Sequence, residues 1–168
     1  AGEILATLSK DTANMISVGG EVLLHLLGDK NGEGPQFHAL NVMTLSMILG
    51  KALNLSEADL ADLALGSIAH DAGKARVPVH LLKAKSRAKH EEDFYRAHVQ
   101  YGVEMAKETG VFSSAAIGVI QNHHEFADGS GFPAGKSDAG VLARIVGVVN
   151  RYDRLCGPES PERPALMP

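Results

Sequence analysis

Apolar residues recur at three- and four-residue steps through most of this 168-residue sequence. That spacing gathers apolar side chains on one face of a helix, whereas a half-buried strand requires apolar and polar residues to alternate. No sustained alternation of this kind is present in the sequence. The pattern therefore predicts an all-α fold, and 45% apolar residues in a chain of this length suffice for one ordinary hydrophobic core.

Helix start and stop signals predict where the helices lie. The predicted helices cover about residues 12–27, 36–53, 56–71, 89–109, 113–124 and 137–155. Ser56 followed by Asp59 resembles a capping box in which Asp replaces the usual Glu, and the third predicted helix should form an antiparallel hairpin with the second. A loop that contains Pro78 is predicted between the third and fourth helices.

Turn-forming residues divide the chain into two parts. Residues 28–35 read GDKNGEGP, so residues 1–34 are interpreted as an N-terminal helix and linker, and residues 35–168 as the compact domain. The tail, residues 157–168, has four prolines in twelve positions and cannot be a regular helix throughout. Because the chain begins at Ala1 rather than at a methionine, we interpret it as a piece of a longer protein. We also expect the compact domain to be truncated at its C-terminus.

Charge and cysteine content exclude several classes of protein. Acidic residues exceed basic ones, 20 to 16, so a broad electrostatic surface for duplex nucleic acid is not expected, whereas a small anionic ligand is. The single Cys156 leaves no disulfide framework, and no apolar segment approaches the roughly 20 residues of a membrane span. The composition predicts a cytoplasmic protein and leaves its oligomeric state open.

Helical spacing places five of the eight histidines toward apolar faces or at the ends of apolar helices. One such histidine is ordinarily a core residue bonded to a backbone carbonyl. Five imidazoles together with a carboxylate instead favour a transition-metal cluster inside a helical bundle, with iron, manganese, nickel or zinc as candidates. The candidate residues are His38, His70, Asp71, His98, His123 and His124, whereas His25, His80 and His90 fall outside the pattern.

Two motifs carry a resemblance to a known family. The segments HDAGKARVP at 70–78 and HHEFADGSGFP at 123–133, with His38 before them and His98 between them, resemble the HD-GYP subgroup of the HD superfamily of metal-dependent phosphohydrolases. The resemblance covers roughly residues 36–155. It implies a helical bundle with a buried binuclear metal site, often of iron, that hydrolyses cyclic di-GMP in bacterial signal transduction.

The resemblance also implies a role for each matched residue. His38, His70 and Asp71 would surround one metal, and Asp71 would bridge to a second metal held by His98, His123 and His124. Asp71 and Lys74 would be the catalytic side chains, with Lys74 near the scissile phosphate. A metal-bridging water, activated to hydroxide, would attack phosphorus in line. The turn that contains Gly129, Ser130 and Gly131 would let the backbone approach the substrate closely.

The sequence departs from the family pattern at four positions. Asn150 stands where the family has a metal-binding Asp, which weakens the first metal site, and Asp153 one helical turn later is a candidate substitute. Gly34 replaces an acid that accompanies a third metal, so two divalent ions are the expected maximum. Phe132 replaces the tyrosine of the motif, and Arg163 is the one basic residue that loosely matches the substrate-binding segment of the tail.

Three hypotheses about function follow from these observations. In the first, the chain is a metal-dependent phosphodiesterase for cyclic di-GMP with an altered metal shell. In the second, it is a catalytically degenerate HD-GYP module that binds a nucleotide or a signalling protein such as a diguanylate cyclase. In the third, it is an HD phosphohydrolase that acts on a different nucleotide or phosphoester through the same metals.

Overall fold

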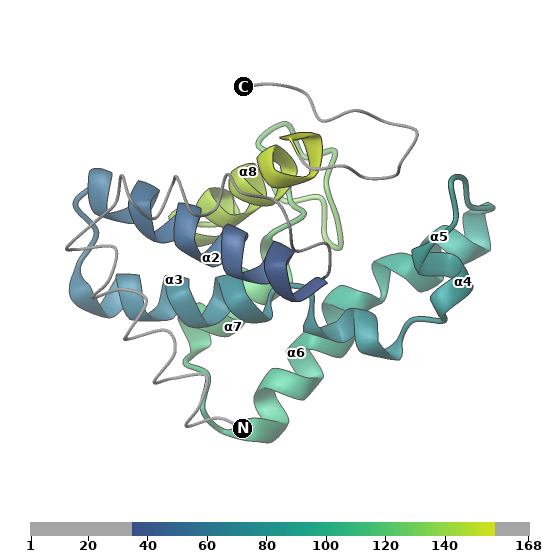
Figure 1. Ribbon diagram of the computed structural model, residues 1–168, viewed down its shortest axis with the longest axis horizontal. Helices are drawn as coiled ribbons and strands as arrows, with labels where there is room; N and C mark the ends of the chain where they lie inside the picture. The colour runs from purple at the N-terminus through teal and green to yellow at the C-terminus, as the bar shows by residue number, and fades with distance from the viewer. Residues whose placement is uncertain (1–34, 157–168) are drawn as a thin grey trace.

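The computed structural model describes residues 35–156, which form a helical bundle (Figure 1). The elements are α2 (Pro35–Ala52), α3 (Glu57–Ala69), the 3-10 helix η1 (Ala72–Arg76), α4 (Val79–Leu82), α5 (Lys89–Arg96), α6 (His98–Thr109), α7 (Ser114–Asn122) and α8 (Val141–Cys156). No strand occurs within this range, so the predicted all-α class is confirmed. The helix predicted over 12–27, the tail at 157–168, His25 and Arg163 lie outside the described residues.

Side-chain caps begin two of the central helices. Ser56 is the N-cap of α3 and accepts a hydrogen bond from the backbone N–H of Asp59 at 3.1 Å, while its hydroxyl donates to the Asp59 carboxylate at 2.7 Å. Ser113 caps α7 in the same way through the N–H of Ala116. These bonds satisfy N–H groups that a helix cannot pair internally. The predicted start of α3 and its hairpin with α2 are therefore confirmed.

The main core lies between α2, α3, α7 and α8, which pack against one another. Its buried residues are Val42, Met43, Met47, Leu63, Ala64, Val119, Ile145, Val146 and Val149. A smaller cluster of Ala69, Val103, Ala106 and Ile120 joins α3, α6 and α7. Burial of this apolar surface fixes the ends of α3, α6 and α7, which carry the motif histidines.

The predicted single helix over 89–109 is wrong, because the chain bends at Ala97 into two helices. The carbonyl of Tyr95 accepts a hydrogen bond from the ring of His98. The N–H of Ala97 bonds to the carbonyls of Asp93 and Tyr95. As a result Phe94 is exposed, although it lies four residues before His98, a spacing that would place both on one face of a continuous helix.

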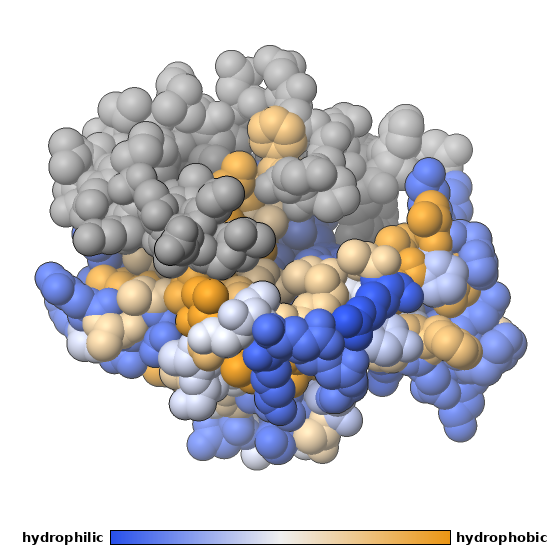
Figure 2. Space-filling view, turned by 90° about the horizontal axis from the view of Figure 1, so that it is seen from below, coloured by the Kyte–Doolittle hydropathy of each residue, from blue (hydrophilic) through white to orange (hydrophobic). Residues whose placement is uncertain are grey.

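Two further boundaries differ from the predictions. Residues 72–82, predicted as a loop, contain the short helices η1 and α4 on either side of Pro78. The last helix begins at Val141 rather than 137, after Gly140, whose φ of 77° lies in the left-handed region that favours glycine. The α4–α5 end of the molecule, at the right of both views, is largely hydrophilic on the face seen in Figure 2. No helix among residues 35–156 has the length and apolarity needed to span a bilayer.

The contact of η1 with α6 depends on Gly73, and we predict that Gly73→Ala destabilises the protein. A Cβ at this position would overlap the carbonyl of His98 and the amide of Gly102, both backbone groups that cannot move independently. We expect a loss of about 1–3 kcal/mol in the free energy of unfolding, measured by urea denaturation. Gly118→Ala in α7, where a Cβ meets nothing within 4 Å, is the matched control. Equal stability of the two variants would contradict this account of the packing.

Candidate metal centre

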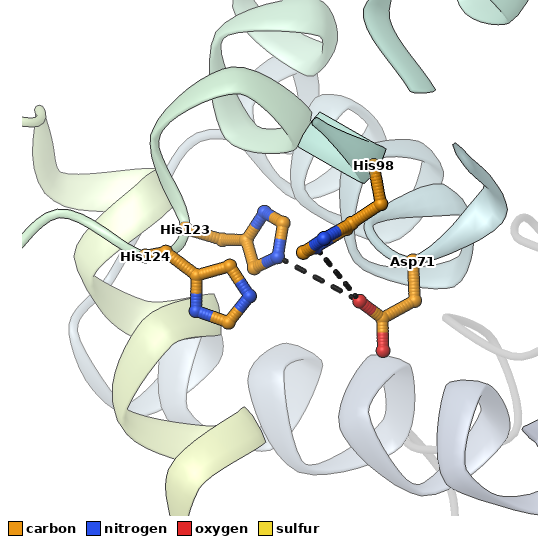
Figure 3. Close-up of side chains that lie close together, drawn as sticks. All are labelled: Asp71, His98, His123 and His124. Carbon is orange, nitrogen blue, oxygen red and sulfur yellow. Dashed lines mark ion pairs between the residues drawn. The ribbon is translucent and has the colours of Figure 1, made fainter. Parts of the chain in front are cut away.

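Asp71 belongs to the motif at 70–78 and lies where the chain leaves α3 and enters η1. The rings of His98, His123 and His124 come from the start of α6 and the end of α7 and turn toward its carboxylate (Figure 3). His70 and His38 lie on the other side of the same group. The structure thus brings together all five histidines that the sequence predicted, and it leaves His80 and His90 exposed at the surface.

Three of these histidines are held by one repeated hydrogen bond. In each, Nδ1 lies within bonding distance of the backbone carbonyl three residues earlier, at a helix end or a helix start. The distances are 2.7 Å from His70 to Ser67, 2.6 Å from His98 to Tyr95 and 2.8 Å from His123 to Ile120. Because a carbonyl oxygen can only accept, Nδ1 carries a proton in each ring, and in a neutral ring Nε2 then presents its lone pair.

The lone pairs point at a carboxylate rather than at donors. The Nε2 atoms of all five histidines and Oδ1 of Asp71 are buried, and none has a hydrogen-bond partner among the described residues. Buried polar atoms are nearly always paired, because leaving them unsatisfied costs about 1–3 kcal/mol each. Lone pairs that face one another across a few ångströms also repel. A cation bound among such atoms would satisfy those that ligate it, so the donor set fits a metal ion.

The charge states agree with this interpretation. Burial lowers the pKa of His98 and, more strongly, that of His123, and burial together with His98 lowers the pKa of His124 to about 3. These rings are therefore uncharged at neutral pH, as a metal ligand must be. Burial raises the pKa of Asp71, but His70, Lys74 and Arg154 lower it by more, so the pKa lies well below its usual value and the carboxyl is ionised.

The two carboxylate oxygens of Asp71 divide the cluster into two groups. Oδ1 lies 3.5 Å from Nε2 of His98 and 3.8 Å from Nε2 of His123. Together with His124 these residues form a group whose four ligand atoms lie within 4.8 Å of one another. Oδ2 lies 3.6 Å from Nε2 of His38 and 3.3 Å from Nε2 of His70, which form the second group. The geometry therefore offers one position with four side-chain ligands and one with three.

Two cations contact the second group directly. Lys74 Nζ lies 2.5 Å from Oδ2 of Asp71, and Arg154 Nη2 lies 3.1 Å from the same oxygen. Sequence reasoning singled out Lys74 but missed Arg154, which the motif gave no reason to select. The step of four residues places Arg154 on the same helix face as Asn150, but this spacing does not indicate where the end of a long side chain lies.

The two polar residues predicted to complete the first metal site have other partners. Asn150 is buried, and its Oδ1 accepts a hydrogen bond from Nε of Arg154 at 3.0 Å. Oδ2 of Asp153 lies 2.7 Å from Nδ1 of His38, and Oδ1 accepts from the Asn41 amide at 3.1 Å. This contact orients the His38 ring so that Nε2 faces Asp71. Direct metal binding by Asn150 or Asp153 stays a prediction.

The glycine-rich turn is built onto the histidine pair. Gly131 packs so closely against the backbone of His124 and Phe126 that a Cβ would overlap both. The buried carboxylate of Glu125, which sequence reasoning passed over, accepts the N–H groups of Ala134 and Lys136 at 2.7 and 2.8 Å. These contacts fix the loop against the end of α7.

The exposed side of this turn holds the other predicted substrate contacts. The N–H and hydroxyl of Ser130 both bond to the Asp128 carboxylate, while Gly129 takes a positive φ of 76°. Phe132 stacks on the His124 ring with centroids 4.4 Å apart. The phenylalanine that replaces the family's tyrosine therefore still provides an aromatic ring that packs against the histidine pair. Substrate binding by Gly129, Ser130 and Gly131 stays a prediction.

A pocket opens beside the histidine pair. It has a volume of about 230 Å³ and is lined by His123, His124, Phe126, Gly147, Asn150, Arg151, Arg154 and Leu155. The lining thus combines two histidines of the candidate metal centre with two arginines of α8. A small anionic ligand would therefore find positive charge beside the buried histidines.

Residues 21–168 match the HD domain family, so the chain belongs to that family, and the resemblance predicted from the motifs is confirmed. The chain is 30% identical over 121 residues to the cyclic di-GMP phosphodiesterase PA4108 of Pseudomonas aeruginosa. These aligned residues cover 70% of this chain and 29% of that protein. It is also 30% identical over 112 residues to the cyclic di-GMP phosphodiesterase response regulator RpfG of Xanthomonas campestris pv. campestris, 64% of this chain and 30% of that protein.

A solved structure supports the fold. Bd1817, a HDG"Y"P protein from Bdellovibrio bacteriovorus, matches with a TM-score of 0.77 and 24% sequence identity, over 92% of this chain and 53% of that chain. At this identity the likeness establishes the helical bundle alone. The chain spans about three tenths of the length of the two phosphodiesterases, so it corresponds to one part of each.

Proposed function

We propose that this HD-family chain is a metal-dependent phosphodiesterase that hydrolyses the cyclic dinucleotide cyclic di-GMP. The observation that carries the proposal is the set of unpaired Nε2 atoms facing the Asp71 carboxylate. Such a set has no use in a dry core and fits a divalent transition metal. The substrate class is supported by the two relatives, both of which are cyclic di-GMP phosphodiesterases.

The four-residue group is the better candidate for a resident ion. Asp71, His98, His123 and His124 supply one carboxylate oxygen and three imidazole nitrogens, a mixed donor set that suits iron, manganese, nickel or zinc. Among these metals, the family resemblance favours iron. The family pattern adds a second ion at His38, His70 and Asp71. A metal in this centre would supply a Lewis acid and lower the pKa of a bound water.

The protein's own side chains would prepare the site for an anionic substrate. Lys74 approaches Asp71 from η1 with its ammonium 2.5 Å from Oδ2, which places a positive charge beside the metal position. Its side chain is only partly exposed, so its charge acts on a phosphate more strongly than in water. The loop fixed by Glu125 and Gly131 keeps His124 in place and shields one side of the centre.

A second candidate function has one specific observation in its favour. Asn150 accepts a hydrogen bond from Arg154, so the residue that should complete the first metal site is engaged with a cation. A chain with an incomplete site could bind cyclic di-GMP, or a signalling protein such as a diguanylate cyclase, without hydrolysing it. The pocket beside the histidine pair would then be the ligand site.

Turnover measurements distinguish the two functions. We expect the chain, loaded with iron or manganese, to open cyclic di-GMP to the linear dinucleotide and to hydrolyse bis-para-nitrophenyl phosphate more slowly. Removal of the metal by a chelator should reduce both rates to background, and metal addition should restore them. Binding of cyclic di-GMP by calorimetry, with no hydrolysis of either compound above the chelated control, would favour the binding module.

A further inference from the structure

We infer that Arg154 is a fixed cation that takes the place of the first metal of the family pattern, so that this chain holds one ion, on the Oδ1 side of Asp71. The inference rests on the proposed metal centre and makes it more specific. It comes from an asymmetry between the two oxygens of one carboxylate. Both oxygens face imidazole nitrogens, but Oδ1 lacks a donor among the described residues, whereas Oδ2 already contacts two cationic side chains.

The Oδ2 side is the one where the first metal would lie. Nε2 of His38 and Nε2 of His70 both face this oxygen, at 3.6 and 3.3 Å. Arg154 approaches the same oxygen from α8 and donates to it through Nη2 at 3.1 Å. A dication bound here would meet the guanidinium at short range, and like charges at such a distance repel.

Asn150 and Arg154 form a hydrogen-bonded pair on α8. Asn150 is 3% exposed, so its amide oxygen needs a donor, and Nε of Arg154 supplies one at 3.0 Å from one helical turn away. The neutral amide adds no negative charge that would draw a metal to this side. In the family pattern an Asp carboxylate at this position binds a metal ion. In this chain the Asn150 amide instead accepts from the Arg154 guanidinium, which supplies the positive charge.

The replacement leaves Arg154 available to a ligand as well. The side chain is 33% exposed and lines the pocket beside His123 and His124. A guanidinium has five N–H donors. The contacts to Asn150 and Asp71 use two of them, and the Tyr95 side chain is a further hydrogen-bond partner. The remaining donors on this wall of the pocket suit a phosphate oxygen.

Metal stoichiometry tests the inference without any measurement of activity. Wild type dialysed against excess Mn²⁺ and then freed of loose metal should retain about one ion per chain, because one position has a complete ligand set. Asn150→Asp should also retain about one, since the new carboxylate pairs with Arg154. The metal content of the double variant Asn150→Asp with Arg154→Ala should rise to about two ions per chain, because the Oδ2 side of Asp71 then gains an anionic side chain and loses a cationic one.

The control variant is Arg151→Ala, which removes an exposed arginine from the same helix turn that has no contact with Asp71 among those described. It should retain the wild-type stoichiometry in both the wild-type and the Asn150→Asp background. Two ions in the wild type, or one in the folded double variant, would overturn the role of Arg154 while leaving the metal centre intact. Metal-free wild type and double variant, both folded by circular dichroism, would overturn the metal centre and the inference together.

Discussion

His123→Ala is expected to remove most of the bound metal and with it the stabilisation that metal gives. His123 is 1% exposed, lies 3.8 Å from Oδ1 of Asp71 and belongs to the four-residue group, so its loss leaves three ligands. An ion present at about 100 times its dissociation constant stabilises the folded state by about 2.7 kcal/mol. Melting temperature should therefore rise with added metal in the wild type and stay nearly constant in the variant.

The comparison of metal-loaded with metal-free protein separates ligation from packing. Removal of a buried ring leaves a cavity, which lowers the stability of the metal-loaded and the metal-free protein alike. Loss of a metal ligand removes only the extra stability that the metal-loaded protein has over the metal-free protein. His80→Ala, at an exposed position in α4, is the matched control and should keep the full metal-induced shift. An undiminished shift in His123→Ala would show that this histidine is a simple core residue.

Lys74→Met is expected to lower the rate of phosphodiester hydrolysis about a hundredfold, the effect typical of removing one group that stabilises developing negative charge. Methionine keeps the length of the side chain and removes the charge that lies beside Asp71. Metal content should not fall, because the substitution removes a cation from the neighbourhood of the metal position. The measurement is kcat/KM for cyclic di-GMP, with metal analysis on the same sample.

Arg76→Met tests whether the effect of Lys74 is local. Arg76 lies in the same short helix, but its guanidinium pairs with Glu104 and Glu108 at the surface. Exposed ion pairs contribute little, so this variant should hydrolyse the substrate at nearly the wild-type rate. Equal rates in Lys74→Met and wild type would remove Lys74 from the catalytic account.

The clustering of the candidate ligands was largely predictable from sequence because these residues lie at positions that local structure dictates. His70 and His123 each follow a helix that ends in an apolar stripe, and the cap geometry aims Nε2 inward through a bond to the carbonyl three residues back. Spacing was sufficient to find such residues. For His98 the prediction of burial was right, but the single helix on which it was based was wrong. The chain bends at Ala97, and Phe94 is exposed to solvent.

Features that depend on the reach of long side chains were not predictable. Arg154 meets Asp71 across 83 positions of sequence, and helical periodicity says nothing about where a flexible guanidinium ends. The pairing of Asp153 with Nδ1 of His38 likewise depends on how α8 lies against α2. Glu125 was passed over because its partners, two backbone N–H groups of the following loop, leave no pattern in the sequence.

Anomalous diffraction from crystals grown with manganese tests the central claim most directly. Data collected above and below the manganese edge locate the ion without reference to catalysis. We predict a peak within coordination distance of Nε2 of His98, His123 and His124 and of Oδ1 of Asp71, with Arg154 still bonded to Oδ2. Crystals that contain the folded chain and excess manganese but show no anomalous peak among these four side chains would contradict the account.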